Sequence, residues 1–108
     1  MAKKIKDPIA CLQKLGSNQR DIVANLKKHK IQGYKNNRKL CPLARYLCQE
    51  TFAKYNPQVT KENVFLDKGE GEFANYDLPR AFRNFIESFD GDKYPELVDI
   101  YGMLKREL

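Results

Sequence analysis

Long apolar runs are absent from this sequence of 108 residues. A transmembrane helix needs about 20 consecutive apolar residues, and no stretch reaches that length, so we expect no membrane span. The first 17 residues begin with Lys3, Lys4 and Lys6 and then alternate apolar with polar residues, unlike the apolar core and small-residue cleavage site of a secretory signal. Without a membrane span or a secretory signal, we expect a cytoplasmic protein. Because a chain of this length has room for one hydrophobic core, we expect a single domain, residues 1–108.

Cysteine and histidine are too few, and too widely spaced, for the common disulfide and metal frameworks. The three cysteines, Cys11, Cys41 and Cys48, are an odd number and contain none of the closely spaced pairs that zinc sites use. His29 is the one histidine, and it lies among lysines. We therefore expect reduced thiols, no metal and no cofactor.

Acidic residues are missing between Asp21 and Glu50, whereas seven basic residues fall in that interval. A surface made only for solubility would mix both signs, so the interval predicts a site for an anion. We name residues 27–45 the basic segment. Its one aromatic residue, a tyrosine, adds a ring on which a nucleic-acid base could stack. The candidate nucleic-acid or anion-binding residues are Lys27, Lys28, Lys30, Tyr34, Lys35, Arg38, Lys39 and Arg45.

The net charge of +6 is distributed unevenly. Residues 1–50 contain 12 basic and 3 acidic side chains (+9), whereas residues 51–108 contain 8 basic and 11 acidic ones (−3). Either the two halves bind different partners, or the basic run is no binding site and is only a solvated face or docks on the acidic half. The sequence leaves both alternatives open.

Apolar residues at helical spacing predict several short helices. The pattern favours a first helix over residues 8–15 and a second over about 18–30, with Ser17 as its N-cap. A third helix begins at residue 42 and ends somewhere between residues 52 and 55. A longer amphipathic helix follows Pro79 and ends at Asp90-Gly91, and a last helix follows Tyr94. Between the second and third helices, residues 31–40 have the composition of an exposed, positively charged connector.

Residues 64–66 and 73–76 have strand composition and flank a glycine-containing loop, which is typical of a β-hairpin. The predicted fold class is therefore mostly α (α+β), with about five short helices in one compact domain and one β-hairpin. Its basic helical half is residues 1–55, and the hairpin with the remaining helices occupies residues 56–108.

Cys41 precedes a proline, and this pair suggests the start of a helix. At an N-cap, free amides and the helix dipole lower the pKa of a thiol, and Arg38, Lys39 and Arg45 would act in the same direction. A nucleophilic cysteine also needs a base, however, and His29 would have to fold back across the connector. A thiol-dependent activity at Cys41 is thus a third hypothesis, beside a purely structural N-cap.

The phosphate-binding loop of P-loop enzymes is also missing, and the gap before the third helix is about three times the turn of a helix-turn-helix motif. We therefore expect a small non-enzymatic domain that engages nucleic acid or another polyanion through the basic segment. The alternative is a protein–protein adaptor, which binds an acidic surface with the same residues or a second copy through the aromatic C-terminal helices.

Two stretches resemble a pattern found in small uncharacterised bacterial proteins. The first is Cys41-Pro42-Leu43-Ala44-Arg45-Tyr46-Leu47; the second is Leu78-Pro79 continued through Phe85, Phe89-Asp90 and Tyr94-Pro95-Glu96-Leu97. The resemblance covers about half of the chain. It implies a stand-alone bacterial cytosolic domain, but no activity, cofactor or site residue.

Overall fold

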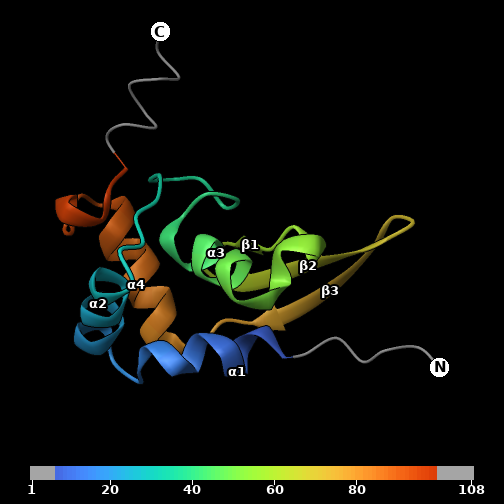
Figure 1. Cartoon of the computed structure of the whole chain (residues 1–108), viewed down its shortest axis with the longest axis horizontal. Helices are drawn as coiled ribbons and strands as arrows, with labels where there is room; N and C mark the ends of the chain where they lie inside the picture. Colours follow the sequence, from blue (N-terminus) through green and yellow to red (C-terminus); the bar gives the residue numbers. More distant parts are fainter. Residues whose placement is uncertain (1–6, 100–108) are drawn as a thin grey trace, which may run out of the picture.

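Four α-helices and a three-stranded antiparallel sheet build residues 7–99, the part of the chain that the computed structural model describes (Figure 1). The helices are α1 (Pro8–Leu12), α2 (Gln19–Lys28), α3 (Pro42–Leu47) and α4 (Arg80–Asp90). The strands are β1 (Gln58–Val59), β2 (Asn63–Gly69) and β3 (Glu72–Asp77). Short 3-10 turns cover Gln13–Leu15, Ala53–Tyr55 and Pro95–Leu97, and a π-helical turn covers Cys48–Phe52. The mixed α+β class is thereby confirmed.

Side chains at the helix starts satisfy the free amides of the first turn. Asp7 accepts a hydrogen bond from the amide of Ile9 at 2.9 Å, and Pro8 occupies the first helical position of α1. Asn18, rather than the predicted Ser17, caps α2 by accepting from the amide of Asp21 at 2.9 Å. The predicted cap was wrong by one position, because Asn18 is the residue with extended backbone angles before the helix.

One cluster of buried side chains holds the described residues together and draws on both halves of the sequence. Within it α1 contacts α3, and α2 contacts α4. The strongly amphipathic α4 buries three phenylalanines, Phe82, Phe85 and Phe89. These rings form the core, so they are not available for the self-association that the aromatic C-terminal residues suggested. Among residues 7–99, Phe73 on β3 is the one large apolar side chain that is exposed.

The predicted hairpin is confirmed as β2 and β3, which extend away from the helices in Figure 1. Its turn residues, Glu70 and Gly71, both have positive φ (56° and 79°), as the favoured two-residue hairpin turns require. Val64 and Leu66 point from β2 into the core. The third strand, β1, was not predicted, because two residues are too short to show an alternating pattern.

The connector is less exposed than its composition predicts, because residues 31–33 are joined to residues 97–99. Ile31 and Gly33 are buried. The Gly33 amide donates to the carbonyl of Leu97, and the Asp99 amide donates to the carbonyl of Gly33, both at 2.9 Å. The prediction of an exposed connector was therefore wrong for this part.

The predicted last helix begins as the 3-10 turn Pro95–Leu97, and its remainder lies outside the described residues. The predicted helices over 8–15 and from 42 onward are α-helical only in their first turns and continue as 3-10 or π turns. Within residues 7–99, none of the helices has the length and apolar character needed to span a membrane.

Candidate anion-binding surface

The basic segment runs from the last turn of α2, through the connector, to the middle of α3. Five of its candidate residues are exposed, namely Lys27, Lys28, Lys30, Arg38 and Lys39. Three are half-buried, namely Tyr34, Lys35 and Arg45. The exposure of most cations fits a surface site, and the half-buried residues show where the segment packs on the rest of the fold.

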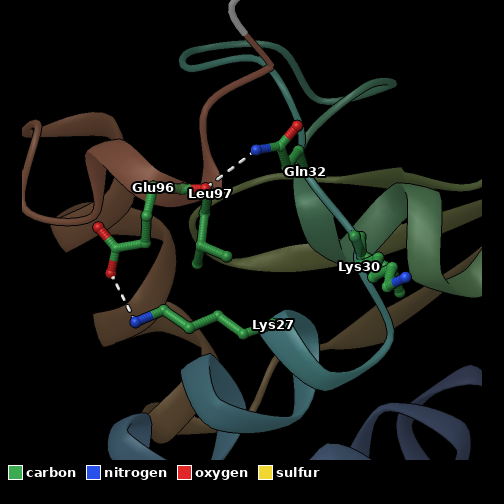
Figure 2. A pocket seen from close by; sticks show the side chains of 6 residues that line it. Lys27, Lys30, Gln32, Glu96 and Leu97 are labelled. Carbon is green, nitrogen blue, oxygen red and sulfur yellow. Dashed lines mark hydrogen bonds and ion pairs between the residues drawn. The ribbon is translucent and has the colours of Figure 1, made fainter.

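Three of these cations form ion pairs with acidic residues near the end of the described chain. We name residues 90–99 the acidic segment. Lys27 Nζ lies 3.0 Å from Glu96 Oε1 (Figure 2). Arg45 Nη1 lies 2.9 Å from Asp99 Oδ2. The third pair joins Lys35 and Asp92. For these three cations, docking of the basic half on the acidic half is therefore confirmed.

Backbone groups reinforce this docking. The Gln32 side chain donates to the carbonyl of Glu96 at 3.1 Å, as Figure 2 shows, and the Asn36 amide donates to Asp90 Oδ1 at 2.9 Å. The Glu96 carboxylate is stabilised first by its own backbone amide and then by Lys27, and both hold its pKa below the ordinary value. This lowered pKa favours the charged form of Glu96 where it meets Lys27.

The Tyr34 ring is half-buried and Arg45 lies over one of its faces, so it is less open than the exposed stacking platform that the sequence suggested. The Arg45 guanidinium lies 5.0 Å above the centre of the Tyr34 ring, within the range of a cation–π contact. The same guanidinium donates to the carbonyl of Gln32 at 2.9 Å. Arg45 is therefore held by three groups, and its role in this structure is to join parts of the fold.

Four cations of the basic segment remain without an ion pair to any residue in 7–99: Lys28, Lys30, Arg38 and Lys39. They lie in two groups along the chain. Lys28 is the last residue of α2 and Lys30 lies in the turn just after it, while Arg38 and Lys39 lie in the turn before α3. These four side chains carry the uncompensated positive charge of the basic segment.

Two cavities adjoin these groups. The first, of about 520 Å³, is lined by Lys27, Lys30, Ile31, Gln32, Glu96 and Leu97. In Figure 2 the Lys27 side chain reaches Glu96, whereas the Lys30 amine points away from it. The second, of about 290 Å³, has Arg38 on its rim together with Lys61 from the turn between β1 and β2. Lys61 was not predicted from the sequence, because no local signal links it to the basic segment.

Cys41 caps α3 as the structural hypothesis predicted, and its sulfur accepts from the amide of Ala44 at 3.4 Å. The residue is 3% exposed. Burial raises the pKa of Cys41 to about 12, although the Ala44 amide acts in the opposite direction. The lowered pKa expected from the helix dipole is therefore wrong, because removal of the thiolate from water outweighs the dipole.

His29 lies with its ring 6.0 Å from that of Tyr46, measured between centroids. No hydrogen bond to Cys41 is formed by His29 in the described part of the chain. Within residues 7–99 there is also no group of three or more metal-ligating side chains. What the described part of the basic segment presents is positive charge and hydrogen-bonding groups.

Comparison with known proteins finds no matching family model, no similar curated protein and no similar solved structure. The functional assignment therefore depends on the side chains described above, and the resemblance in the two stretches around Cys41 and Phe85 stays a prediction.

Proposed function

We propose that this protein is a small non-enzymatic domain that binds a polyanion, in the first place nucleic acid, through the basic segment. The observation that supports this is the set of four exposed cations without a carboxylate partner in residues 7–99: Lys28, Lys30, Arg38 and Lys39. Phosphate groups bind where cations are not already neutralised, because association is driven largely by release of counterions from the nucleic acid.

The number of free cations sets the expected salt dependence. Each neutralised phosphate contributes a slope of about −0.9 on duplex DNA, or about −0.7 on a single strand, to a plot of log K against log salt concentration. Four contacts therefore predict a slope of about −3 to −4. If the three paired cations also bound phosphate, the slope would be steeper.

The test is a pair of charge-reversal variants with the same change in net charge. Arg38→Glu with Lys39→Glu removes two free cations from the basic segment. Lys54→Glu with Lys68→Glu removes two exposed lysines elsewhere. Lys35 is left intact because it pairs with Asp92. We expect oligonucleotide affinity to fall about tenfold or more in the first variant and much less in the second.

Equal affinity of the Arg38/Lys39 variant and the unchanged protein would overturn the proposal, provided that both unfold at the same urea concentration. Equal losses in both double variants would show that net charge alone matters and that the basic segment is no site.

An acidic protein surface is the second candidate partner, and the position of Tyr34 beneath Arg45 favours it. With this ring covered, recognition depends on charge, which a carboxylate-rich surface also provides. A partner that stays bound after nuclease treatment, with a defined stoichiometry, would support this candidate. In either case the location we propose is the cytosol, where the three cysteines would stay reduced.

A further inference from the structure

The cavity of about 290 Å³ differs from the rest of the basic segment because it combines free cations with an apolar floor. It lies between the connector turn, the β1 end of the sheet and the end of α4. Its volume lies just below the roughly 300–1,000 Å³ typical of ligand pockets, which suits one small ring system. Its floor and rim are formed by Asn36, Asn37, Arg38, Cys41, Val59, Thr60, Lys61, Ile86 and Asp90.

The walls of this cavity are fixed to one another by hydrogen bonds. The Val59 amide donates to the carbonyl of Arg38 at 2.8 Å, which ties the connector turn to β1. The Asn36 amide donates to Asp90 Oδ1 at 2.9 Å, which ties the same turn to α4. Asn37 accepts from the amides of Lys39 and Leu40 and so shapes the turn itself. The cavity is therefore formed before any ligand arrives, which lowers the entropic cost of binding.

The cations on the rim are available to a ligand. Neither Arg38 nor Lys61 forms an ion pair with any residue in 7–99, in contrast to Lys27, which also lines a cavity but pairs with Glu96. The one hydrogen bond of the Arg38 guanidinium among the described residues goes to Gln58 Oε1 and is long, at 3.5 Å. An anionic group at the mouth of the cavity would meet two uncompensated positive charges.

Asp90 gives the inner wall a hydrogen-bond acceptor. Its Oδ1 accepts from the Asn36 amide, while its Oδ2 has no hydrogen-bond partner within residues 7–99. An ionised carboxylate can only accept hydrogen bonds, so a ligand group close to Asp90 must donate one. Val59, Ile86 and Cys41 supply apolar contact beside it.

We propose that this cavity takes the base of one unstacked nucleotide, with its amino group on Asp90 and its phosphate on Arg38 and Lys61. The inference rests on the proposed function and specifies its ligand. Adenine, cytosine and guanine carry an exocyclic amino group, whereas the Watson–Crick edge of uracil offers only N3–H between two carbonyl oxygens, which the Asp90 carboxylate would repel. The site therefore prefers single-stranded nucleic acid with an amino-bearing base.

The test is an amide NMR titration of the full chain with adenosine 5′-monophosphate, uridine 5′-monophosphate, adenosine and inorganic phosphate. We expect adenosine 5′-monophosphate to shift the amides of Val59, Thr60 and Lys61 and to bind more tightly than the other three. In Arg38→Gln with Lys61→Gln its affinity should fall about tenfold or more, because each lost hydrogen bond involves a charged group. The matched control, Lys54→Gln with Lys68→Gln, removes two exposed lysines outside the basic segment and should bind it as the unchanged protein does.

Asp90→Asn tests the base contact while keeping an oxygen that accepts from the Asn36 amide. We expect this variant to lose the preference for adenosine over uridine 5′-monophosphate, since the asparagine amide can also donate. A preference that survives Asp90→Asn, or inorganic phosphate that binds as tightly as adenosine 5′-monophosphate, would overturn the base-binding cavity.

A parallel titration with a single-stranded oligonucleotide separates this inference from the proposed function. Oligonucleotide binding without shifts at Val59, Thr60 and Lys61 would overturn the cavity as a nucleotide site and leave polyanion binding intact. Absence of any oligonucleotide binding would overturn both.

Discussion

Arg45 Nη1 lies 2.9 Å from Asp99 Oδ2, so that an ion pair connects side chains 54 positions apart in the sequence. Together with the pairs Lys27–Glu96 and Lys35–Asp92 it joins the basic segment to the acidic segment. The uneven charge of the sequence thus serves two purposes: part of it holds the domain together, and the remainder lies free on the surface.

Removal of the Arg45 guanidinium should destabilise the domain. Arg45→Ala deletes the bonds to Asp99 and to the carbonyl of Gln32 and uncovers Tyr34. Because these groups are only partly buried, we expect a loss of about 1–2 kcal/mol in the free energy of unfolding, measured with urea. Lys28→Ala, which removes an unpaired cation, should change it by less than about 0.5 kcal/mol. Equal losses in the free energy of unfolding for Arg45→Ala and Lys28→Ala would contradict the role given to Arg45.

Neutralisation of the acidic segment should strengthen polyanion binding. Asp92→Asn with Glu96→Gln releases Lys35 and Lys27 from their ion pairs and leaves them for phosphate. We expect oligonucleotide affinity at low salt to rise about threefold or more. Glu70→Gln with Glu72→Gln makes the same change in net charge on the exposed hairpin and should have a smaller effect. An equal rise in both would show that the ion pairs do not limit binding.

Gly33→Ala should be among the most damaging single substitutions. A Cβ atom at Gly33 would lie 2.5 Å from the nitrogen of Pro42 and 2.6 Å from the carbonyl oxygen of Leu40. Since both are backbone atoms, the connector and the start of α3 would have to move apart. We expect a loss of about 3 kcal/mol or more in the free energy of unfolding.

Gly91→Ala is the matched control, because its Cβ would meet nothing closer than the Glu87 carbonyl at 3.2 Å. It should cost about 1 kcal/mol or less. The free energy of unfolding of both variants is measured by chemical denaturation. Equal stability of the Gly33→Ala and Gly91→Ala proteins would show that residues 33 and 40–42 do not pack closely.

The stability of the domain should fall in alkali as Cys41 ionises in the unfolded chain. Its pKa is raised from 9.0 to about 12 by burial, so the unfolded chain releases the proton first. The free energy of unfolding is then unaffected by Cys41 below about pH 9 and falls by about 1.4 kcal/mol per pH unit between 9 and 12. The comparison is with Cys41→Ser, which keeps a capping oxygen but does not ionise in this range. Identical slopes for the two proteins would contradict a buried, neutral thiol.

Local signals predicted much of the fold. The caps at Asp7 and Cys41 depend on residues within one helical turn, and α4 shows an uninterrupted apolar stripe, so each was visible in a short stretch of sequence. The hairpin likewise follows from two strands and the glycines between them. In these elements local preference and tertiary packing agree.

Long-range contacts were beyond prediction from one sequence. Gly33 pairs with residues 97–99, and the sequence around Gly33 does not indicate that partner. The site was predicted as seven cations and Tyr34 from composition alone. Composition cannot show that Lys27, Lys35 and Arg45 are neutralised by acids elsewhere, or that Lys61 adjoins Arg38. For the same reason the sequence could not predict that burial raises the pKa of Cys41 by more than the helix dipole lowers it, because burial is known only from the fold.

The most direct test of the central claim is an amide NMR titration of the full chain with a mixture of single- and double-stranded oligonucleotides at low and high salt. Polyanion binding through the free cations predicts shifts at low salt around Lys28, Lys30, Arg38 and Lys39, which shrink as salt is raised. No shifts at low salt, or shifts confined to the hairpin of β2 and β3, would contradict a binding site on the basic segment.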